Sequence, residues 1–155
     1  MTGREGPGPR TLYMEAPSMR SDLHNNIDLK RGISPAAATT DNTAWVSQIV
    51  DTAGYDACEF IILTGSLADA DATFTVLVED GATANLADAA AVADQNLLGL
   101  ESTASFTFAA DDKVRKIGYV GMKRYVRVSI TPANNTGNAF VAGVWLLGNP
   151  RVSPT

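Results

Sequence analysis

The segment Asp69-Ala70-Asp71 carries two carboxylates one position apart, directly before a stretch that alternates apolar and polar residues. Carboxylates at alternating positions occur in calcium loops of the EF-hand type. Such a loop also needs further carboxylates at fixed offsets, a glycine at its turn and a bidentate glutamate about twelve positions after the first ligand. None of these follows Asp69. We therefore predict a corner before a strand, in which the aspartates accept hydrogen bonds from the backbone, and no metal site.

Nucleophilic catalysis and zinc binding depend on residue types that are scarce in this chain. His24 is the only histidine and Cys58 the only cysteine. A Ser-His-Asp or Cys-His arrangement would require His24, which lies in a segment with many prolines and glycines. One histidine and one cysteine cannot supply the three or four ligands of a zinc site. Cys58 lies in the strand-like stretch CEFIILT, so we expect a small buried side chain and not a reactive thiol.

Two pairs of adjacent carboxylates, Glu79-Asp80 and Asp111-Asp112, could suggest glycoside hydrolysis. Neighbouring residues in a strand or turn diverge, however, whereas a glycosidase pair must converge across a cleft about 5 to 10 Å wide. The glycine-containing stretch from Gly118 to Gly121 lacks the Lys and Ser/Thr of a phosphate-binding loop. We expect neither an enzyme nor a cofactor.

The charges are distributed unevenly along the chain, whose net charge is −5. No Lys or Arg lies between Gly32 and Asp112, and six cationic residues then follow within fifteen positions: Lys113, Arg115, Lys116, Lys123, Arg124 and Arg127. An acidic protein repels a polyanion, so we expect no nucleic-acid partner and interpret the cluster as solvated strand faces and ion pairs between subunits. No apolar run approaches the roughly 20 residues that cross a bilayer, and we expect no membrane partner.

Residues 1–43 differ from the rest of the chain in composition and in periodicity. They contain four prolines and no sustained period of 2 or 3.6, so we predict an extended N-terminal arm, followed by a body over residues 44–155. Apolar residues recur along the arm: Leu12, Tyr13, Met14, Met19, Leu23, Ile27, Leu29 and Ile33. Such a segment becomes ordered when these side chains are buried, either by a partner, which we favour, or by its own body.

In the body, short stretches that alternate apolar and polar residues, as strands do, are separated by turn residues. Strands are expected at residues 45–50, 58–64, 72–79, 105–109, 114–120, 125–131 and 139–147. Residues 85–98 alone have a helical composition, enough for one or two turns on a crossover loop. In YVRVSIT, Val126, Val128 and Ile130 should point inward. The pattern predicts an all-β fold, an antiparallel β-sandwich, with a jelly roll as one form of it.

Two predicted strands are apolar on both faces. CEFIILT is typical of a strand that lies between two layers. AFVAGVWLL either lies centrally in a two-layer body or presents its second face to a neighbouring subunit. For Trp145 on this strand, core packing and a contact with another subunit remain equal alternatives.

Several phrases of the sequence resemble a family of small proteins encoded by tailed bacteriophages and prophages. They are the stretch from Asp41 to Gly81, AAAVADQNLLG, RKIGYVGMKRYVRVSITP and the ending AFVAGVWLLGNPR, about 110 residues in all. The resemblance implies a virion protein of the capsid decoration, or cement, class. Such a protein is assembled in the host bacterial cytoplasm and lies on the capsid exterior. It binds the major capsid protein and its own copies, as a homotrimer or another symmetric oligomer, and needs no active site.

The resemblance also implies which residues make contacts. The arm would place Leu12, Tyr13, Met14, Leu23, Ile27 and Leu29 in apolar clefts, and the body would contribute Lys123, Arg124, Tyr125 and Trp145. Two alternatives stay open. One is another virion component, such as a tail, connector or head-fibre protein. The other is a carbohydrate-binding sandwich in which Trp45, Tyr55, Tyr119 and Trp145 stack on sugars.

Overall fold

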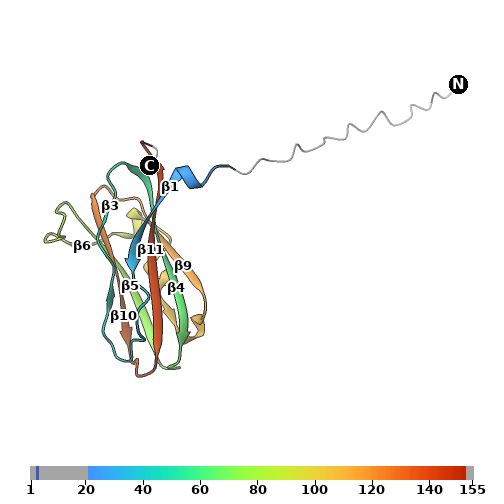
Figure 1. Ribbon diagram of the computed structural model, residues 1–155, viewed down its shortest axis with the longest axis vertical. Helices are drawn as coiled ribbons and strands as arrows, with labels where there is room; N and C mark the ends of the chain where they lie inside the picture. Colours follow the sequence, from blue (N-terminus) through green and yellow to red (C-terminus); the bar gives the residue numbers. More distant parts are fainter. Residues whose placement is uncertain (1–2, 4–20, 153–155) are drawn as a thin grey trace.

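The computed structural model describes residue 3 and residues 21–152. Two antiparallel sheets pack face to face, so the expected all-β sandwich is confirmed (Figure 1). The strands are β1 (Ile27–Ile33), β2 (Trp45–Val46), β3 (Val50–Asp51), β4 (Tyr55–Leu67), β5 (Thr73–Gly81), β6 (Ala90–Ala91), β7 (Leu97–Leu98), β8 (Phe106–Thr107), β9 (Val114–Tyr119), β10 (Tyr125–Ala133) and β11 (Ala139–Pro150). The helical turns are η1 (His24–Asn26), η2 (Asp94–Asn96), α1 (Glu101–Ala104) and η3 (Phe108–Ala110). No helix among these residues could cross a membrane.

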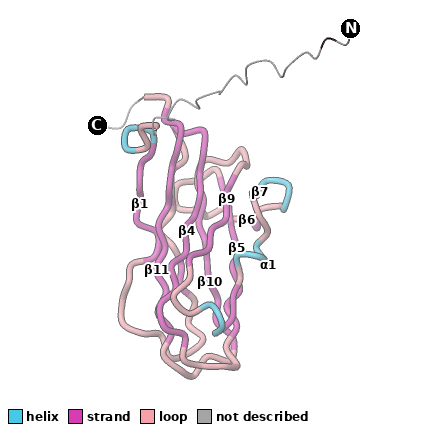
Figure 2. Tube along the Cα trace, turned by 90° about the vertical axis from the view of Figure 1, so that its right-hand side faces the viewer, coloured by secondary structure: helices cyan, strands magenta, loops and turns pink. Residues whose placement is uncertain are grey.

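One sheet has the strand order β1-β11-β4-β9-β7 and the other β2-β10-β5-β6. We call them the first sheet and the second sheet. The long pairs β4–β11 and β5–β10 form the centre of each sheet, and Figure 2 shows the layers from the side. In the first sheet every strand is antiparallel to its neighbours, as short connections allow.

The core lies between the two sheets and follows the alternation of the sequence. Val126, Val128 and Ile130 on β10 are fully buried, which confirms their expected inward direction. From the first sheet, Phe60 and Trp145 meet with their ring centroids 4.6 Å apart and their planes tilted by 58°. This tilted aromatic pair is a geometry that aromatic quadrupoles favour.

β1 lies within the segment that we expected to be an arm. It pairs with β11 from Ile27 opposite Gly148 to Ile33 opposite Gly143, and the side chain of Ile33 is buried in the core. The body therefore begins well before residue 44, and for Ile27–Ile33 the predicted boundary between arm and body is wrong. The sequence IDLKRGI gave no clear period because an edge strand tolerates charged residues on both faces and because the register shifts between Arg31 and Ile33.

A second contact joins the remainder of this segment to the body. Thr39 forms an isolated antiparallel bridge with Ala139, and the buried Asn135 side chain donates hydrogen bonds to the carbonyl oxygens of Thr39 and Asp41 at 3.2 and 3.0 Å. Residues 39–41 are thus tied to the loop between β10 and β11. The expected arm residues Leu12, Tyr13 and Met14 lie outside the described residues.

The segment of helical composition, residues 85–98, crosses from one sheet to the other. It contains β6 in the second sheet, the short turn η2 and β7 in the first sheet. Leu86 has a positive φ of 52° and its side chain is 5% exposed, so tertiary packing holds a bend where the local composition favours a helix. The expected short helical turn on a crossover is confirmed by η2.

Candidate interaction surface

The two outer faces of the sandwich differ in polarity. On the second sheet, the residues that alternate with the buried Phe74, Val76 and Val78 are mostly hydroxyl-bearing or charged. These outward residues include Thr73, Thr75, Glu79, Arg127, Ser129 and Thr131, together with the less polar Val46, Leu77, Ala91, Tyr125 and Ala133. We call this the polar face, because its composition is that of an ordinary solvated sheet surface.

The outer surface of the first sheet is apolar. Residues paired across an antiparallel ladder lie on the same side of the sheet, so the register identifies its members. They are Leu29 on β1, Phe140, Ala142, Val144 and Leu146 on β11, Ile61 and Leu63 on β4, Val114 on β9 and Leu98 on β7. We call this set the apolar face.

Several side chains of the apolar face are open to solvent. Val114 is 67% exposed, Leu98 57%, Leu63 44% and Phe140 41%. Single exposed apolar residues are common on proteins, but a contiguous set across a whole sheet marks an interaction site. The strand CEFIILT was expected to be buried on both faces, and in the described chain it is buried on one face only.

Three charged residues lie on this face: Arg31 on the edge strand β1, opposite Val144, and, among the apolar residues, Glu59 on β4 and Lys116 on β9. Burial raises the pKa of Glu59, and the charge of Lys116 acts in the opposite direction. No ion pair joins them in the described part of the chain. Gly118 makes room here, since a Cβ at this position would lie 2.8 Å from Oε2 of Glu59 and 2.9 Å from Cβ of Leu98.

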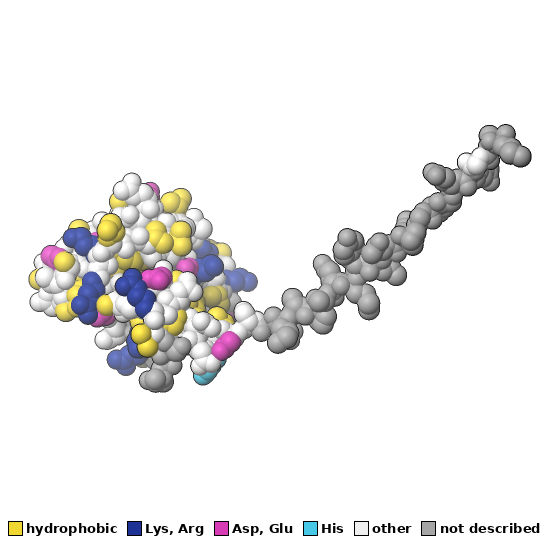
Figure 3. All heavy atoms as spheres, turned by 90° about the horizontal axis from the view of Figure 1, so that it is seen from above, with side chains coloured by type: hydrophobic (Ala, Val, Ile, Leu, Met, Phe, Trp, Pro, Cys, Tyr) yellow, Lys and Arg dark blue, Asp and Glu magenta, His cyan; other side chains and the backbone are white. Residues whose placement is uncertain are grey.

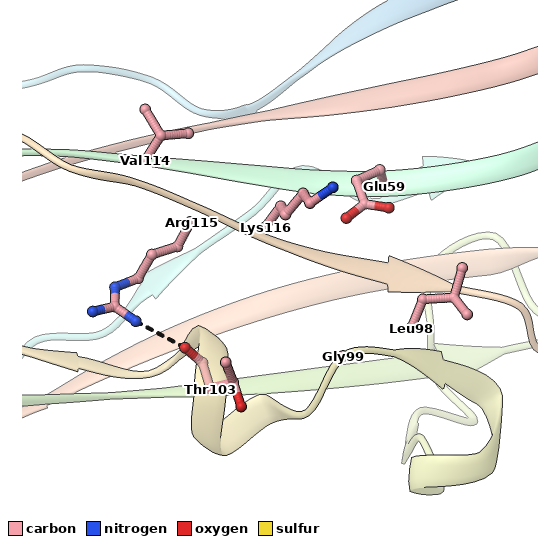
Figure 4. Close-up of a pocket in the computed structure, with 7 residues that line it drawn as sticks. All are labelled: Glu59, Leu98, Gly99, Thr103, Val114, Arg115 and Lys116. Atoms are coloured by element: carbon pink, nitrogen blue, oxygen red, sulfur yellow. Dashed lines mark hydrogen bonds between the residues drawn. The ribbon is translucent and has the colours of Figure 1, made fainter.

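The face is hollowed beside these charges. A depression of about 570 Å³ is lined by Glu59, Leu98, Gly99, Thr103, Val114, Arg115 and Lys116 (Figure 4). Arg115 does not point freely into it, because its guanidinium donates to the carbonyl oxygen of Thr103 at 2.8 Å and lies 5.9 Å from the centre of the Phe106 ring. Within the described ranges no group of three potential metal ligands is found. The depression therefore offers a concave and partly apolar surface to a binding partner.

The predicted contact residues at the start of the body are accessible. Leu23 is 63% exposed before η1, and Leu29 is 56% exposed. Ile27 is half-buried and pairs with Gly148 on the same side of the sheet as Leu29. Ile27 and Leu29 therefore extend the apolar face to the edge strand.

Trp145 is a core residue, and its predicted role as a contact with another subunit is wrong. Its side chain is 1% exposed, packs on Phe60 and donates its indole N–H to the carbonyl oxygen of Gln48 at 3.1 Å. The contact surface of β11 is its other side. The alternation of AFVAGVWLL identified both sides correctly but could not tell which one the second sheet would cover.

The predicted basic contacts lie at the start of β10. Arg124 donates two hydrogen bonds to the carboxylate of Asp51, at 2.8 and 2.7 Å, and its guanidinium lies 5.1 Å from the centre of the Tyr125 ring. Tyr125 is half-buried. Arg127 is paired with Glu79 at 2.8 Å. In the end view of the molecule, basic side chains lie next to acidic ones (Figure 3).

This pairing changes the interpretation of the cationic cluster. Arg124 and Arg127 have their acidic partners within the same chain, so neither requires another subunit to neutralise it. Lys123 is exposed and makes no ion pair within residues 21–152. Of the three adjacent residues predicted as contacts, Lys123 is the one with a free charge.

The Asp69 segment is a corner, as predicted. The Asp69 carboxylate accepts the backbone N–H of Asp71 at 3.0 Å, and the backbone N–H and hydroxyl of Thr136 at 2.7 and 2.8 Å. It thereby joins two loops at one end of the sandwich. Hydrogen bonds from Thr136, first of all the one from its backbone, lower the pKa of Asp69.

The lone cysteine is buried, as expected for CEFIILT. Cys58 is 7% exposed, and burial raises the pKa of its thiol to about 12. A thiol with so high a pKa is a poor nucleophile at neutral pH. His24 lies in η1 and is exposed.

The four aromatic residues considered for sugar stacking do not share an exposed surface. Trp145 and Tyr119 are 1% and 5% exposed, and Trp45 packs against Phe74 with a centroid distance of 6.0 Å. Tyr55 donates its hydroxyl hydrogen bond to Asp28 at 2.7 Å. Nothing in this arrangement favours a carbohydrate site.

The chain matches no known family model, and no curated protein is similar to it in sequence. A functional conclusion therefore depends on the residues and surfaces described above. The most distinctive of these is the contrast between an apolar and a polar face on one sandwich.

Proposed function

We propose that this chain is a structural protein of a tailed-phage virion, which decorates and stabilises the capsid by binding the lattice of the major capsid protein. It acts on the capsid exterior, as a symmetric oligomer of its own copies such as a homotrimer, after assembly in the host bacterial cytoplasm. The observation that carries the proposal is the solvent-exposed apolar face of the first sheet, opposite a polar face. A protein with these two faces is suited to bury one face in an assembly and to expose the other to water.

The energy gained by burying an apolar face agrees with assembly in many copies. Contiguous exposed apolar patches on monomeric proteins rarely exceed a few hundred Å². Burying about 500 Å² of apolar surface contributes roughly 12 kcal/mol at about 25 cal/mol per Å². Association of two free molecules costs about 4 to 15 kcal/mol, so a single contact of this kind is weak. Many copies on a symmetric lattice would make such contacts collectively strong.

The residues before the body add a second attachment. The leader, residues 1–20, contains Leu12, Tyr13 and Met14 and precedes the exposed Leu23. Twenty extended residues reach about 66 Å at about 3.3 Å per residue, enough to pass from the body to a neighbouring subunit. Ile27 and Leu29, which follow the leader in the chain, lie on the apolar face.

The test uses phage heads that lack this protein. Heads are purified from a mutant of the phage that encodes the chain, incubated with purified full-length protein and sedimented. Leu63→Asp and Val114→Asp introduce charge on the apolar face, and Leu77→Asp makes the same kind of change on the polar face as a matched control. We expect the first two variants to lose binding at least tenfold and the control to bind as the wild type does.

Equal binding by all three variants would overturn the role of the apolar face. Cryo-electron microscopy of intact particles then locates the protein directly. Density on the tail, the connector or a head fibre instead of the capsid surface would contradict the decoration role. Glycan-array binding by the isolated protein without any binding to heads would support the carbohydrate alternative.

A further inference from the structure

Glu59 and Lys116 are opposite charges placed close together on the apolar face. Glu59 lies opposite Gly118 and Lys116 opposite Ile61, so the two residues are diagonal neighbours on the adjacent strands β4 and β9. Their side chains come from the same side of the sheet, beside Leu98 (Figure 4). Among the described residues neither has an ion-pair partner. The pair must be accommodated by whatever covers this face.

We propose that the apolar face packs against the same face of a second copy of this chain, around a two-fold axis that passes midway between Glu59 and Lys116. In this arrangement Glu59 of each copy meets Lys116 of the other copy. The inference rests on the proposed function in taking this face as an assembly surface, and it deepens that function: the symmetric oligomer is a dimer or contains dimers, and the face that joins the copies is no longer available to the shell, which the copies would reach through their leaders.

Charge complementarity favours a second copy over a wholly apolar cover. A cover without charges would take a carboxylate and an ammonium group out of water with only each other as counter-charge, and desolvation costs several kcal/mol per ion. A two-fold contact is self-complementary, because residue i of one copy meets residue j of the other and the reverse. Since Glu59 and Lys116 are neighbours on one face, the two-fold axis turns both into ion pairs, while the third charge of the face, Arg31, lies on the exposed edge strand β1.

The dimensions of the sheet set an upper bound on the area of a dimer contact. Five strands spaced about 4.8 Å apart give a width of about 20 Å. β4 has 13 residues and is about 40 Å long at roughly 3.3 Å per residue. The rectangle has an upper bound of about 800 Å², which is the surface that each partner buries in a standard interface. The aliphatic residues around the charges, chiefly Leu63, Val114 and Leu146, would supply the dry contact.

Sedimentation velocity of the full-length protein between about 1 and 100 µM, with light scattering, measures the oligomeric state. We expect a concentration-dependent dimer, or a larger assembly that contains it. Lys116→Glu places the new carboxylate opposite Glu59 of the other copy. Glu59→Lys places the new ammonium group opposite Lys116 of the other copy. Each single reversal should raise the dissociation constant at least tenfold. The double variant with both reversals restores the pairing and should return the constant to within about threefold of the wild type.

Lys123→Glu is the matched control, because it makes the same charge change away from the apolar face and should leave the dissociation constant unchanged. Circular dichroism of each variant establishes that it is folded. Three outcomes would each overturn the inference: a wild type that is monomeric throughout, a dimer that neither single reversal weakens, or a double variant that stays as weak as the single variants. The first would indicate that the face is covered by the leader or by nothing, and the last two that the copies do not meet through Glu59 and Lys116.

Head binding, measured on the same proteins, separates this inference from the proposed function. A monomeric wild type that still binds heads would overturn the two-fold contact and leave the decoration role intact. A charge-dependent dimer that does not bind heads would support the two-fold contact and overturn the decoration role.

Discussion

The ring of Phe60 lies across Gly143, and no other residue fits at that position of β11. A Cβ at Gly143 would overlap the Cζ atom of Phe60 and lie 3.0 Å from Cε1. The same end of the ring also meets Gly32 of β1, where a Cβ would overlap Cε2 and lie 2.8 Å from the carbonyl oxygen of Gly143. One aromatic side chain thus requires glycine on two strands, and it joins β1 to the core.

This contact predicts the effect of Gly143→Ala. Forcing a methyl group into a well-packed core costs about 1 to 3 kcal/mol in the free energy of unfolding, and we expect a loss in that range. Urea unfolding followed by circular dichroism measures it. In a Phe60→Leu background the methyl group has more room, so the same substitution should cost at least about 1 kcal/mol less. An equal cost in both backgrounds would mean that Phe60 is not the obstacle.

The position of β1 predicts where the chain can be shortened. Removing residues 1–20 leaves every described strand intact and should change the free energy of unfolding by less than about 0.5 kcal/mol. Removing residues 1–40 also deletes β1. The loss of the buried Ile33 side chain alone should cost about 2 to 5 kcal/mol, and the edge of β11 becomes free to pair with other chains.

Thermal unfolding of the two truncated proteins, with light scattering to detect aggregation, tests this prediction. The wild type is the common reference. If the protein without residues 1–40 is as stable and soluble as the protein without residues 1–20, β1 contributes nothing to the sandwich.

The sequence predicted the elements whose pattern is local and missed what depends on distant packing. The alternation in YVRVSIT identified the buried Val126 and Val128, because one face of β10 is solvated. IDLKRGI was assigned to an arm, because an edge strand with a register shift has no clean period. Trp145 was ambiguous for a different reason: both sides of β11 are apolar, and only the position of the second sheet decides which side is core.

The burial of Cys58 predicts an unreactive thiol. A pKa of about 12 leaves about one thiolate in ten thousand at pH 8, whereas an ordinary thiol with a pKa near 8.5 is about one quarter ionised. The native protein should therefore react with a disulfide reagent such as DTNB at least a hundredfold more slowly than the protein unfolded in guanidinium, which is the control. Similar rates in both states would contradict the burial of this residue.

The Asp69 corner predicts a pH-dependent contribution to stability. Hydrogen bonds from Thr136 lower the pKa of Asp69 in the folded protein below its unfolded value, which is about 3.9. The carboxylate therefore stabilises the fold above pH about 4, and this contribution is lost as the pH falls through the folded pKa. Asp69→Asn should lower Tm at pH 7, and the difference from the wild type should shrink between pH 5 and pH 2.

Calorimetry across this pH range measures the difference in Tm. Addition of 1 mM calcium at pH 7 should leave the Tm of the wild type unchanged, because the carboxylate oxygens already accept hydrogen bonds from the chain. A rise in Tm with calcium that disappears in Asp69→Asn would instead identify a metal site.

The pairing of Arg124 with Asp51 separates two neighbouring cations that the sequence could not distinguish. Both side chains of the pair are exposed, at 55% and 43%, so Arg124→Ala should lower the stability only slightly, and less at high salt. Arg124→Glu adds repulsion from Asp51 and mixes a folding effect with any docking effect.

Lys123 has no such partner in the described chain. Lys123→Glu should therefore leave Tm unchanged and weaken head binding more at 50 mM than at 500 mM salt, since a long-range charge interaction is screened as salt rises. Equal weakening at both salt concentrations would show that Lys123 does not act through its charge.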